Sequence, residues 1–523
     1  MRAVGVVLFL VVLGTVVATG ARRWRIPAPS LLVLAGVAVA SIPGVPALHI
    51  APQTIALVVL PPLLYASAEE LSLRDLKTVW RPVTVLVFGL VLASAAMVGA
   101  LAVALTPLHA SMAFVLGAIL ASTDPVAVTA LGRRLALPSR MQTLVQAESL
   151  FNDASSLVLF RVAVTVAVTS GAFSPLGAGG EFVRLAGGGL LVGAALGGVV
   201  IVIRRRTADP VLETVIALVT PYAAYVVAEQ SHTSGVTAVV VAGVVLGRSG
   251  QRLSDARIRL QLHAVYGVVV FLLETVVFAV IGLELPALVR DLSPGTGWWP
   301  LQAITIAAAL LALRVLWMLP VSSSLTPADA RHSWPVAAVL TWAGTRGVMP
   351  LAAALSIPLV TDSGQALPGR PLVLVLTTAV VVLTLIAQGL TLAPLVSRSG
   401  IALEPEHTAR EEAEARARLA RTALAHLDAQ SGSEITDELV LDRVRRALDA
   451  RLQQADEAAH APGGAGEAGT HLAAYTALRR EVLAIQSTEL RRLYDEHEIS
   501  DTTRREIQHD LDQQEIALTD DAR

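Results

Sequence analysis

Apolar segments long enough to cross a lipid bilayer recur at short intervals between residues 3 and 397. A helix needs about 20 mostly apolar residues to cross a hydrocarbon core that is roughly 30 Å thick. We place thirteen such spans, at residues 3–21, 28–43, 52–68, 82–106, 111–131, 143–169, 184–203, 211–230, 234–248, 262–288, 301–323, 334–357 and 371–397. The pattern predicts an all-α polytopic membrane protein with about thirteen transmembrane helices.

Basic residues gather in alternate loops between these spans. The loops after the first, third, fifth, seventh and ninth spans are rich in arginine and begin at Arg22, Arg74, Arg133, Arg204 and Arg248. The second and fourth loops contain neither lysine nor arginine. Because basic loops stay on the cytoplasmic side, we predict a multi-pass protein of the cell membrane with its N-terminus outside and its C-terminal tail in the cytoplasm.

The composition changes near residue 402. Residues 404–523 hold 26 acidic and 15 basic residues, whereas the part before them holds 16 acidic and 25 basic residues. Residues 407–429, 435–457 and 471–497 show helical spacing of apolar positions. We therefore divide the chain into a transmembrane exchange domain, residues 1–402, and a cytoplasmic, helical, acidic regulatory tail, residues 403–523. A bundle that only aids assembly is the alternative for the tail.

The stretch from Glu148 to Asp153 places two carboxylates, an amide and a hydroxyl inside the sixth apolar span. Ionisable groups at that depth are costly, and they usually mark an ion pathway or a binding site. Residues four apart share one face of a helix, so Ser149 lies with Asp153 and Glu148 lies with Asn152. We predict that Asp153 is the central titrating group and that, with Ser149, it holds either a proton or a hard monovalent cation.

Glu148 needs a positively charged partner, because an unpaired carboxylate in the membrane is strongly destabilising. Two arginines lie at depth, Arg314 in the eleventh span and Arg346 in the twelfth. We predict that Glu148, together with Asn152, pairs with Arg314. The alternative for Glu148 and Asn152 is a purely structural polar network that holds helices together.

Two spans are interrupted in a similar way, the fifth at residues 122–125 and the twelfth at residues 344–350. Proline removes a backbone donor, and non-helical backbone within a membrane is tolerated where it lines a cavity. Matching interruptions in two halves of a chain indicate a transporter site built on inverted repeats. We therefore predict two unwound, crossing helices, with Asp124 beside one break and Arg346 beside the other.

These features favour a secondary transporter and exclude several other classes. The chain has no cysteine and no HExxH motif, which excludes thiolate metal sites and cysteine nucleophiles and gives no sign of a metalloprotease. The Gly-x-Gly-Asp motif of intramembrane aspartyl proteases is missing, and no repeated channel filter is visible. A sensor or scaffold without transport activity would be expected to lose Asp153. We therefore predict no enzyme, no cofactor and no nucleic-acid partner.

Competition at one carboxylate is enough to couple two ion fluxes. If Asp153 binds either H⁺ or one monovalent cation, alternating access exchanges one for the other without net charge. The sequence therefore predicts an electroneutral antiporter. It does not decide between Na⁺ (or Li⁺) and K⁺, because that choice depends on the size of the site and its number of ligands.

Three motifs resemble the monovalent cation:proton antiporter family, which includes bacterial NhaP-type and animal NHE-type sodium/proton exchangers. They are residues 123–128 (TDPVAV), 148–154 (ESLFNDA) and 344–347 (GTRG). The resemblance covers essentially the whole membrane domain. It implies a thirteen-helix fold with a six-helix core domain and a dimerisation domain, an elevator-like cycle, a homodimer, and a role in intracellular pH and sodium homeostasis.

The resemblance also implies roles for single residues. Asp153 corresponds to the family's ion- and proton-binding aspartate, and Asn152 to its partner in the Asn-Asp pair of electroneutral members. The residues at or beside the cation (Na⁺ or K⁺) are implied to be Ser149, Thr123 and Asp124. Those implied to form the structural salt bridges are Glu148 with Arg314, and Arg346 in the Gly-x-Arg-Gly turn. Thr345 and Met349 replace residues that are usually apolar or small in the family.

Overall fold

The computed structural model divides into two compact units, Met1–Ala402 and Leu403–Arg523. It describes residues 2–24, 28–42, 51–71, 73–123, 139–169, 175–207, 209–253, 256–292, 297–325, 333–399, 405–430, 438–460 and 467–496, with a few single residues beyond them. Asp124, one of the predicted site residues, lies outside these ranges. Each unit is considered by itself.

The regular elements within the described ranges are helices, apart from one isolated bridge between Val360 and Ala366. Among the described residues, seven helices are long and apolar enough to cross a membrane: Leu76–Leu105, Met141–Val168, Gly179–Arg204, Pro210–Gln230, Ile258–Arg290, Trp299–Ser322 and Arg370–Leu392. Six shorter apolar helices accompany them in the same part of the chain, including Leu8–Ala21, Ala28–Ala40 and Gly235–Ser249. The predicted helical membrane protein is thus confirmed at this level. The number thirteen, the inverted repeats and the crossing helices stay predictions.

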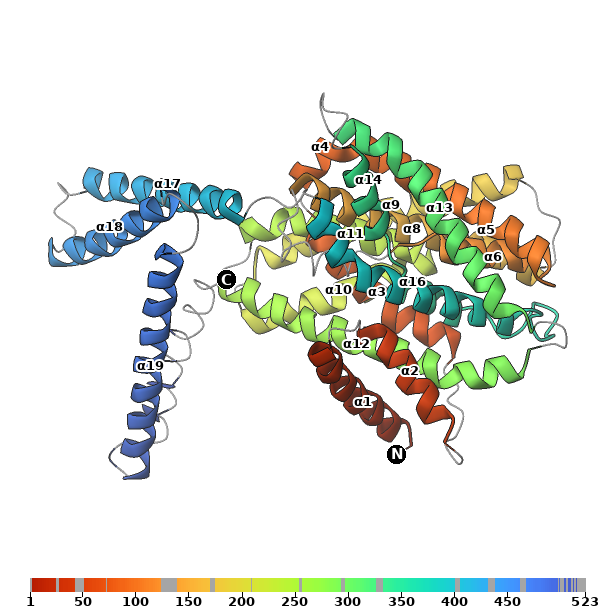
Figure 1. The fold of residues 1–523 in the computed structure, drawn as a ribbon, viewed down its shortest axis with the longest axis horizontal. Helices are drawn as coiled ribbons and strands as arrows, with labels where there is room; N and C mark the ends of the chain where they lie inside the picture. The colour runs from red at the N-terminus through yellow and green to blue at the C-terminus, as the bar shows by residue number, and fades with distance from the viewer. Residues whose placement is uncertain are drawn as a thin grey trace. The chain divides into compact units, whose positions relative to one another are not determined.

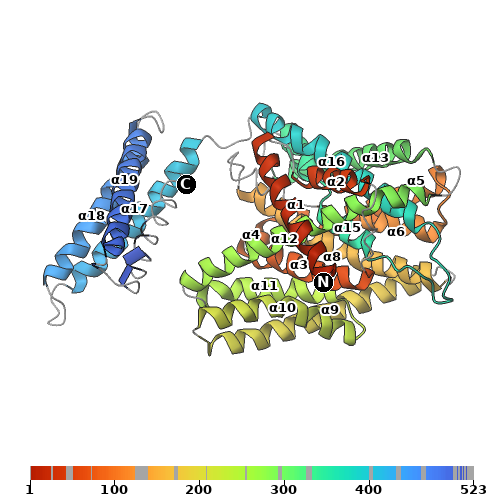
Figure 2. The ribbon, with the colours of Figure 1, turned by 90° about the horizontal axis from the view of Figure 1, so that it is seen from below.

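The helices of the first unit fall into two groups by their contacts (Figures 1 and 2). The first helix group comprises α4 (Leu73–Thr84), the π-helix η1 (Val85–Leu90), α5 (Val91–Leu105), α6 (Ala110–Leu120), α8 (Ser139–Thr169), α13 (Trp299–Leu325), α14 (Ser333–Ala343), α15 (Val348–Leu355) and α16 (Arg370–Ser399). Within it α5 packs on α6, α6 on α8, and α13 on both α14 and α16.

The second helix group comprises α1 (Arg2–Trp24), α2 (Ala28–Ala40), α3 (Pro52–Glu69), α9 (Pro175–Arg204), α10 (Pro210–Gln230), α11 (Gly235–Leu253) and α12 (Ala256–Arg290). Here α2 packs on α12, and α11 packs on α3, α9 and α10. The two groups meet where α8 contacts α9 and α11, where α15 contacts α3 and α12, and where α16 contacts α12. α8 therefore lies at the boundary between the groups.

Glycines allow the second group's helices to approach closely. A Cβ atom at Gly36 of α2 would lie 2.7 Å from the carbonyl oxygen of Ala279 on α12. A Cβ atom at Gly193 of α9 would lie 2.4 Å from the carbonyl oxygen of Ala238 on α11, whereas one at Gly198 would meet nothing within 4 Å. Small residues at contacts are typical of helix packing in membranes.

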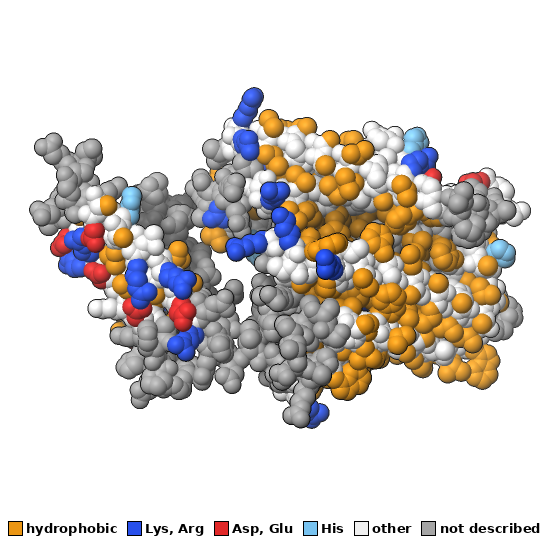
Figure 3. Space-filling view, turned by 90° about the horizontal axis from the view of Figure 1, so that it is seen from above, with side chains coloured by type: hydrophobic (Ala, Val, Ile, Leu, Met, Phe, Trp, Pro, Cys, Tyr) orange, Lys and Arg blue, Asp and Glu red, His pale blue; other side chains and the backbone are white. Residues whose placement is uncertain are grey.

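The surface of the first unit is strongly apolar. Hydrophobic side chains cover most of its face in Figure 3. Large ones on α9 are exposed, such as Leu191 (70% exposed) and Val183 (69% exposed). Apolar areas of this extent are not expected on a protein surrounded by water. They match the lipid-facing surface of a membrane protein.

The described part of the second unit contains the helices α17 (Pro405–Gln430), α18 (Glu438–His460) and α19 (Glu467–Asp495). α17 packs on α18, and Arg421 of α17 forms a 2.6 Å ion pair with Asp456 of α18. Leu483 and Leu490 of α19 form a small apolar cluster with Leu511. The unit's helical character agrees with the periodicity of the sequence, and its regulatory role stays a prediction.

Candidate functional site

The polar stretch of the sixth span lies on α8, and four of its side chains are buried. Glu148, Ser149, Asn152 and Asp153 are 1%, 2%, 0% and 6% exposed. α8 can hold these polar side chains because its other buried residues are apolar and pack against α4, α6, α14 and α15. The site is therefore built from one helix and from the ends of the helices around it.

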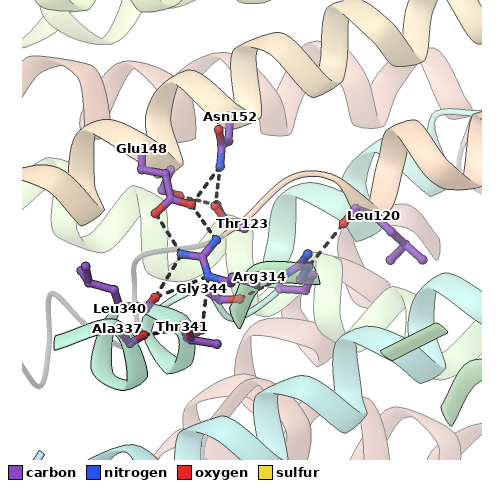
Figure 4. Close-up of polar contacts among 11 residues, drawn as sticks. Leu120, Thr123, Glu148, Asn152, Arg314, Ala337, Leu340, Thr341 and Gly344 are labelled. Carbon is purple, nitrogen blue, oxygen red and sulfur yellow. Dashed lines mark hydrogen bonds and ion pairs between the residues drawn. The ribbon is translucent and has the colours of Figure 1, made fainter. Parts of the chain in front are cut away.

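Glu148 forms a fully buried ion pair with Arg314 of α13 (Figure 4). The pair is bidentate, with Nη1 2.6 Å from Oε1 and Nη2 2.9 Å from Oε2. The structure thus places Arg314 where the sequence analysis expected the partner of Glu148. Two parallel charge-assisted hydrogen bonds are the strongest form of such a pair, and they fix both side chains in one plane.

Arg314 also binds the end of α14. Its Nε donates to the carbonyl of Thr341 at 3.2 Å, and its Nη2 donates to that of Leu340 at 3.2 Å. These carbonyls belong to the last turn of a helix that ends at Ala343, where few backbone N–H groups remain to donate to them, although that of Gly344 donates to the carbonyl of Thr341 at 3.3 Å. Gly344 follows, and a Cβ atom there would lie 2.0 Å from Cζ of Arg314. The glycine therefore makes room for the guanidinium.

Asn152 connects this ion pair to the end of α6. Its Nδ2 donates to Oε1 of Glu148 at 3.1 Å and to Oγ1 of Thr123 at 3.2 Å. Its Oδ1 is buried without a hydrogen-bond partner in the part of the chain that the structure describes. Asn152 therefore lies on the face of α8 that carries Glu148, and it also reaches the neighbouring helix end.

Asp153 lies beside the residues that follow α6. The hydroxyl of Ser122 donates to Oδ1 of Asp153, and the hydroxyl of Ser149 donates to the carbonyl of Thr123. Ser122 and Thr123 are 2% exposed each, just past the helix end at Leu120. The sequence analysis missed Ser122 as a contact of Asp153, although Ser122 directly precedes the Thr-Asp-Pro break. Asp124 lies outside the described residues.

Arg346, which the sequence predicts to belong to the structural salt bridges, contacts backbone carbonyls within the described residues, and its place in a salt bridge stays a prediction. It is 4% exposed and forms no ion pair with any carboxylate of the described residues. Its Nε donates to the carbonyl of Leu120 at 3.3 Å, and its Nη1 donates to that of Gly344 at 2.9 Å. Leu120 ends α6 and Gly344 follows α14, so Arg346 binds backbone acceptors at two helix ends. Both carboxylate oxygens of Glu148 are already bound by Arg314.

The sequence analysis also missed two ion pairs within the apolar unit. Arg204 of α9 is 2% exposed and lies 2.8 Å from Glu213 of α10, which is fully buried. Arg161 of α8 pairs with Glu229 of α10 at 2.6 Å. Glu213 and Glu229 lie inside the span predicted at residues 211–230, and acidic residues within an apolar span are the sequence signal of such pairs.

The first unit is an apolar helical bundle with a buried aspartate beside the end of α6 and a fully buried ion pair next to it, an arrangement expected of a membrane protein that carries ions. The sequence profile of the family described as sodium/hydrogen exchanger, transmembrane, matches residues 7–398. The chain belongs to this family, whose members are transporters and not enzymes. The resemblance found in the three motifs is thereby confirmed.

Individual relatives agree with this assignment. The chain is 32% identical over 527 residues to a Mycobacterium tuberculosis protein named as an uncharacterized Na⁺/H⁺ exchanger, covering 98% of this chain and 95% of that one. It is 32% identical over 409 residues to the Na⁺/H⁺ antiporter ApNhaP of Aphanothece halophytica, covering 77% and 76%.

A solved structure shows the same fold. The sodium proton antiporter MjNhaP1 from Methanocaldococcus jannaschii superposes with a TM-score of 0.62 at 20% identity. The match covers 76% of this chain and 99% of that one.

The Glu148–Arg314 pair gives a prediction for stability. Glu148→Gln and Arg314→Gln each leave one buried charge unpaired, and each is expected to lower the free energy of unfolding by about 3–5 kcal/mol. The double variant leaves no charge and should lose much less than the sum of the two single losses. Thermal unfolding of the four purified proteins in one detergent measures this coupling.

The ion pair between Arg184 and Glu181 of α9 provides the control, because these side chains are 62% and 35% exposed and the pair lies within one helix. Arg184→Gln is expected to change the free energy of unfolding by no more than about 0.5 kcal/mol. Additive losses for Glu148→Gln and Arg314→Gln would show that the pair is not a structural unit.

Proposed function

We propose that the chain is a secondary antiporter that exchanges Na⁺ or Li⁺ for H⁺ across the cell membrane. The observation that carries this proposal is the position of Asp153, a 6% exposed carboxylate beside the hydroxyl of Ser122 at the end of α6. The intramembrane arginines nearby are engaged elsewhere, Arg314 by Glu148 and Arg346 by backbone carbonyls. We therefore assign the exchange of the cation and the proton to Asp153, which is buried beside the oxygen atoms at the end of α6.

The atoms around Asp153 suit a hard monovalent cation. Ser122, Thr123 and Ser149 bring hydroxyl and carbonyl oxygens to the same helix end, and Asp153 adds the negative charge. Oxygen donors are the ligands that hard cations prefer. We assign Asp153, Ser149 and Thr123 to the cation, with Asn152 beside them. Asp124 joins this set on the resemblance to the family alone.

Exchange follows from competition at this carboxylate. Asp153 is neutral when it holds a proton, and it then lacks the charge that attracts a cation. It is equally neutralised when it holds Na⁺, so the site crosses the membrane with the same charge in both loaded forms. One Na⁺ therefore exchanges for one H⁺, and transport is electroneutral. The Glu148–Arg314 pair carries no net charge and stays closed during the cycle.

The surroundings of the site complete the proposal. We place the N-terminus outside the cell and residues 403–523 in the cytoplasm as a regulatory unit, from the distribution of basic loops. We also propose that two copies form a homodimer and that the exchanger serves intracellular pH and sodium homeostasis, as the family membership suggests.

Replacing Asp153 tests the assignment. In proteoliposomes with an imposed pH gradient, addition of Na⁺ or Li⁺ should dissipate the gradient with the wild-type protein. Asp153→Asn keeps the size of the side chain but has no exchangeable charge, so dissipation should fall to the level of protein-free vesicles. Asp291→Asn, at the exposed end of α12, should behave like the wild type.

Two outcomes would contradict this account. Normal exchange by Asp153→Asn would remove Asp153 from the site. Dissipation by K⁺ with little response to Na⁺ or Li⁺ would replace the proposed cation by K⁺ and leave the mechanism unchanged.

Electroneutrality gives a separate prediction. Moving one net charge across a membrane is worth about 2.3 kcal/mol per 100 mV, so an electrogenic exchanger responds strongly to voltage. The rate of Na⁺-driven pH dissipation should therefore stay constant when a diffusion potential is imposed across the vesicle membrane. A rate that follows the imposed potential would contradict the one-for-one exchange.

A further inference from the structure

Arg161 and Glu229 form an ion pair that connects the two helix groups. Arg161 lies on α8, and Glu229 lies near the end of α10. Nη1 of Arg161 is 2.8 Å from Oε2 of Glu229, and Nη2 is 2.6 Å from Oε1. The side chains are 29% and 33% exposed, so the pair is less buried than that of Glu148 and Arg314.

The second helix group holds Glu229 in place for this contact. The backbone N–H of Gly235, the first residue of α11, donates to Oε1 of Glu229 at 3.1 Å. Tyr225 of α10 accepts a hydrogen bond from Nη2 of Arg161 at 3.0 Å, and its ring centroid is 5.9 Å from the guanidinium carbon. A Cβ atom at Gly235 would lie 2.8 Å from Oε1 of Glu229. The N–H of Gly235 thus holds the carboxylate of Glu229, and that carboxylate and the side chain of Tyr225 together bind Arg161.

The pair lies on the helix that carries the proposed ion site. Arg161 follows Asp153 by eight residues, which is about 12 Å along a helix that rises 1.5 Å per residue. α8 and α10 share little packing of their own, so this contact joins them mainly through side chains. If α8 and Asp153 move by several ångströms relative to α10 and α11, hydrogen bonds of 2.6–3.0 Å between them cannot persist.

We propose that the Arg161–Glu229 pair is a latch that closes the boundary between the two helix groups at this end of α8 and must open in each transport cycle. The inference rests on the proposed function, because alternating access supplies the movement. The latch favours the state in which Arg161 is bound. Weakening it shifts the populations of the two states, and the apparent affinity for the cation changes with the population that binds it.

Cross-linking tests whether the pair must separate. Because the chain has no cysteine, the double variant Arg161→Cys/Glu229→Cys carries only the two introduced thiols. A bis-methanethiosulfonate linker about as long as the replaced ion pair should stop Na⁺-driven pH dissipation, and a reductant should restore it. The matched control is Glu181→Cys/Arg184→Cys on α9, where the linker stays within one helix and exchange should continue.

Unchanged exchange by the cross-linked Arg161→Cys/Glu229→Cys protein would overturn the latch while leaving the antiporter intact. Absence of exchange by the wild-type protein would instead overturn the proposed function. The two failures are therefore distinguishable in one set of vesicles.

Charge variants supply a second measurement that does not depend on the linker. Glu229→Gln and Arg161→Gln should each change the maximal rate or the apparent Na⁺ affinity by about two- to fivefold, as expected for a partly exposed pair. The swapped variant Arg161→Glu/Glu229→Arg should return these values toward the wild type. Single variants with wild-type kinetics would overturn the latch.

Discussion

The buried ion pair between Glu148 and Arg314 is the interaction on which the rest of the site depends. It joins α8 to α13, and the same guanidinium binds the carbonyls at the end of α14. Taking two charges out of water costs several kcal/mol per ion, and this cost is offset only when the geometry and the additional hydrogen bonds are good. The bidentate contact, the backbone acceptors and the space at Gly344 meet that condition together.

This arrangement separates fixed charge from exchangeable charge. Arg314 and Arg346 bind Glu148 and the carbonyls of ended helices, so non-helical backbone can exist inside an apolar unit. Asp153 lies one turn from Glu148 along α8 but faces the end of α6 and the hydroxyl of Ser122. One helix therefore carries a permanent structural charge on one face and the proposed ion site on another.

Two other ion pairs in the first unit differ in how far they are buried. Arg204 and Glu213 are buried within the second helix group and bind α9 to α10. Arg161 and Glu229 lie at the boundary between the groups, and their side chains are 29% and 33% exposed. Burial is appropriate for a contact that stays closed, because breaking it would expose two charges to a medium of low dielectric constant. The pair of Arg161 and Glu229 is less buried, which is consistent with the opening that the proposed latch requires.

Much of the fold and part of the site followed from local sequence patterns. Residue spacing along a single segment is enough to predict the helical membrane unit, the break after α14 and the two faces of α8. The contacts of Ser122, Arg346 and Arg161 could not be predicted in this way, because their partners are 31, 226 and 68 positions away in the chain. Arg204 was assigned to a loop, because its burial depends on Glu213, which lies beyond the turn that follows α9.

The central claim is that a cation and a proton compete for Asp153, and proton release on cation binding tests it most directly. The purified protein is held in weakly buffered detergent solution at a pH at which Asp153 is protonated, and Na⁺ is added. The account predicts that the wild type releases close to one proton for each Na⁺ bound and that Asp153→Asn releases none. Na⁺ binding without proton release, or the same release from Asp153→Asn, would contradict it.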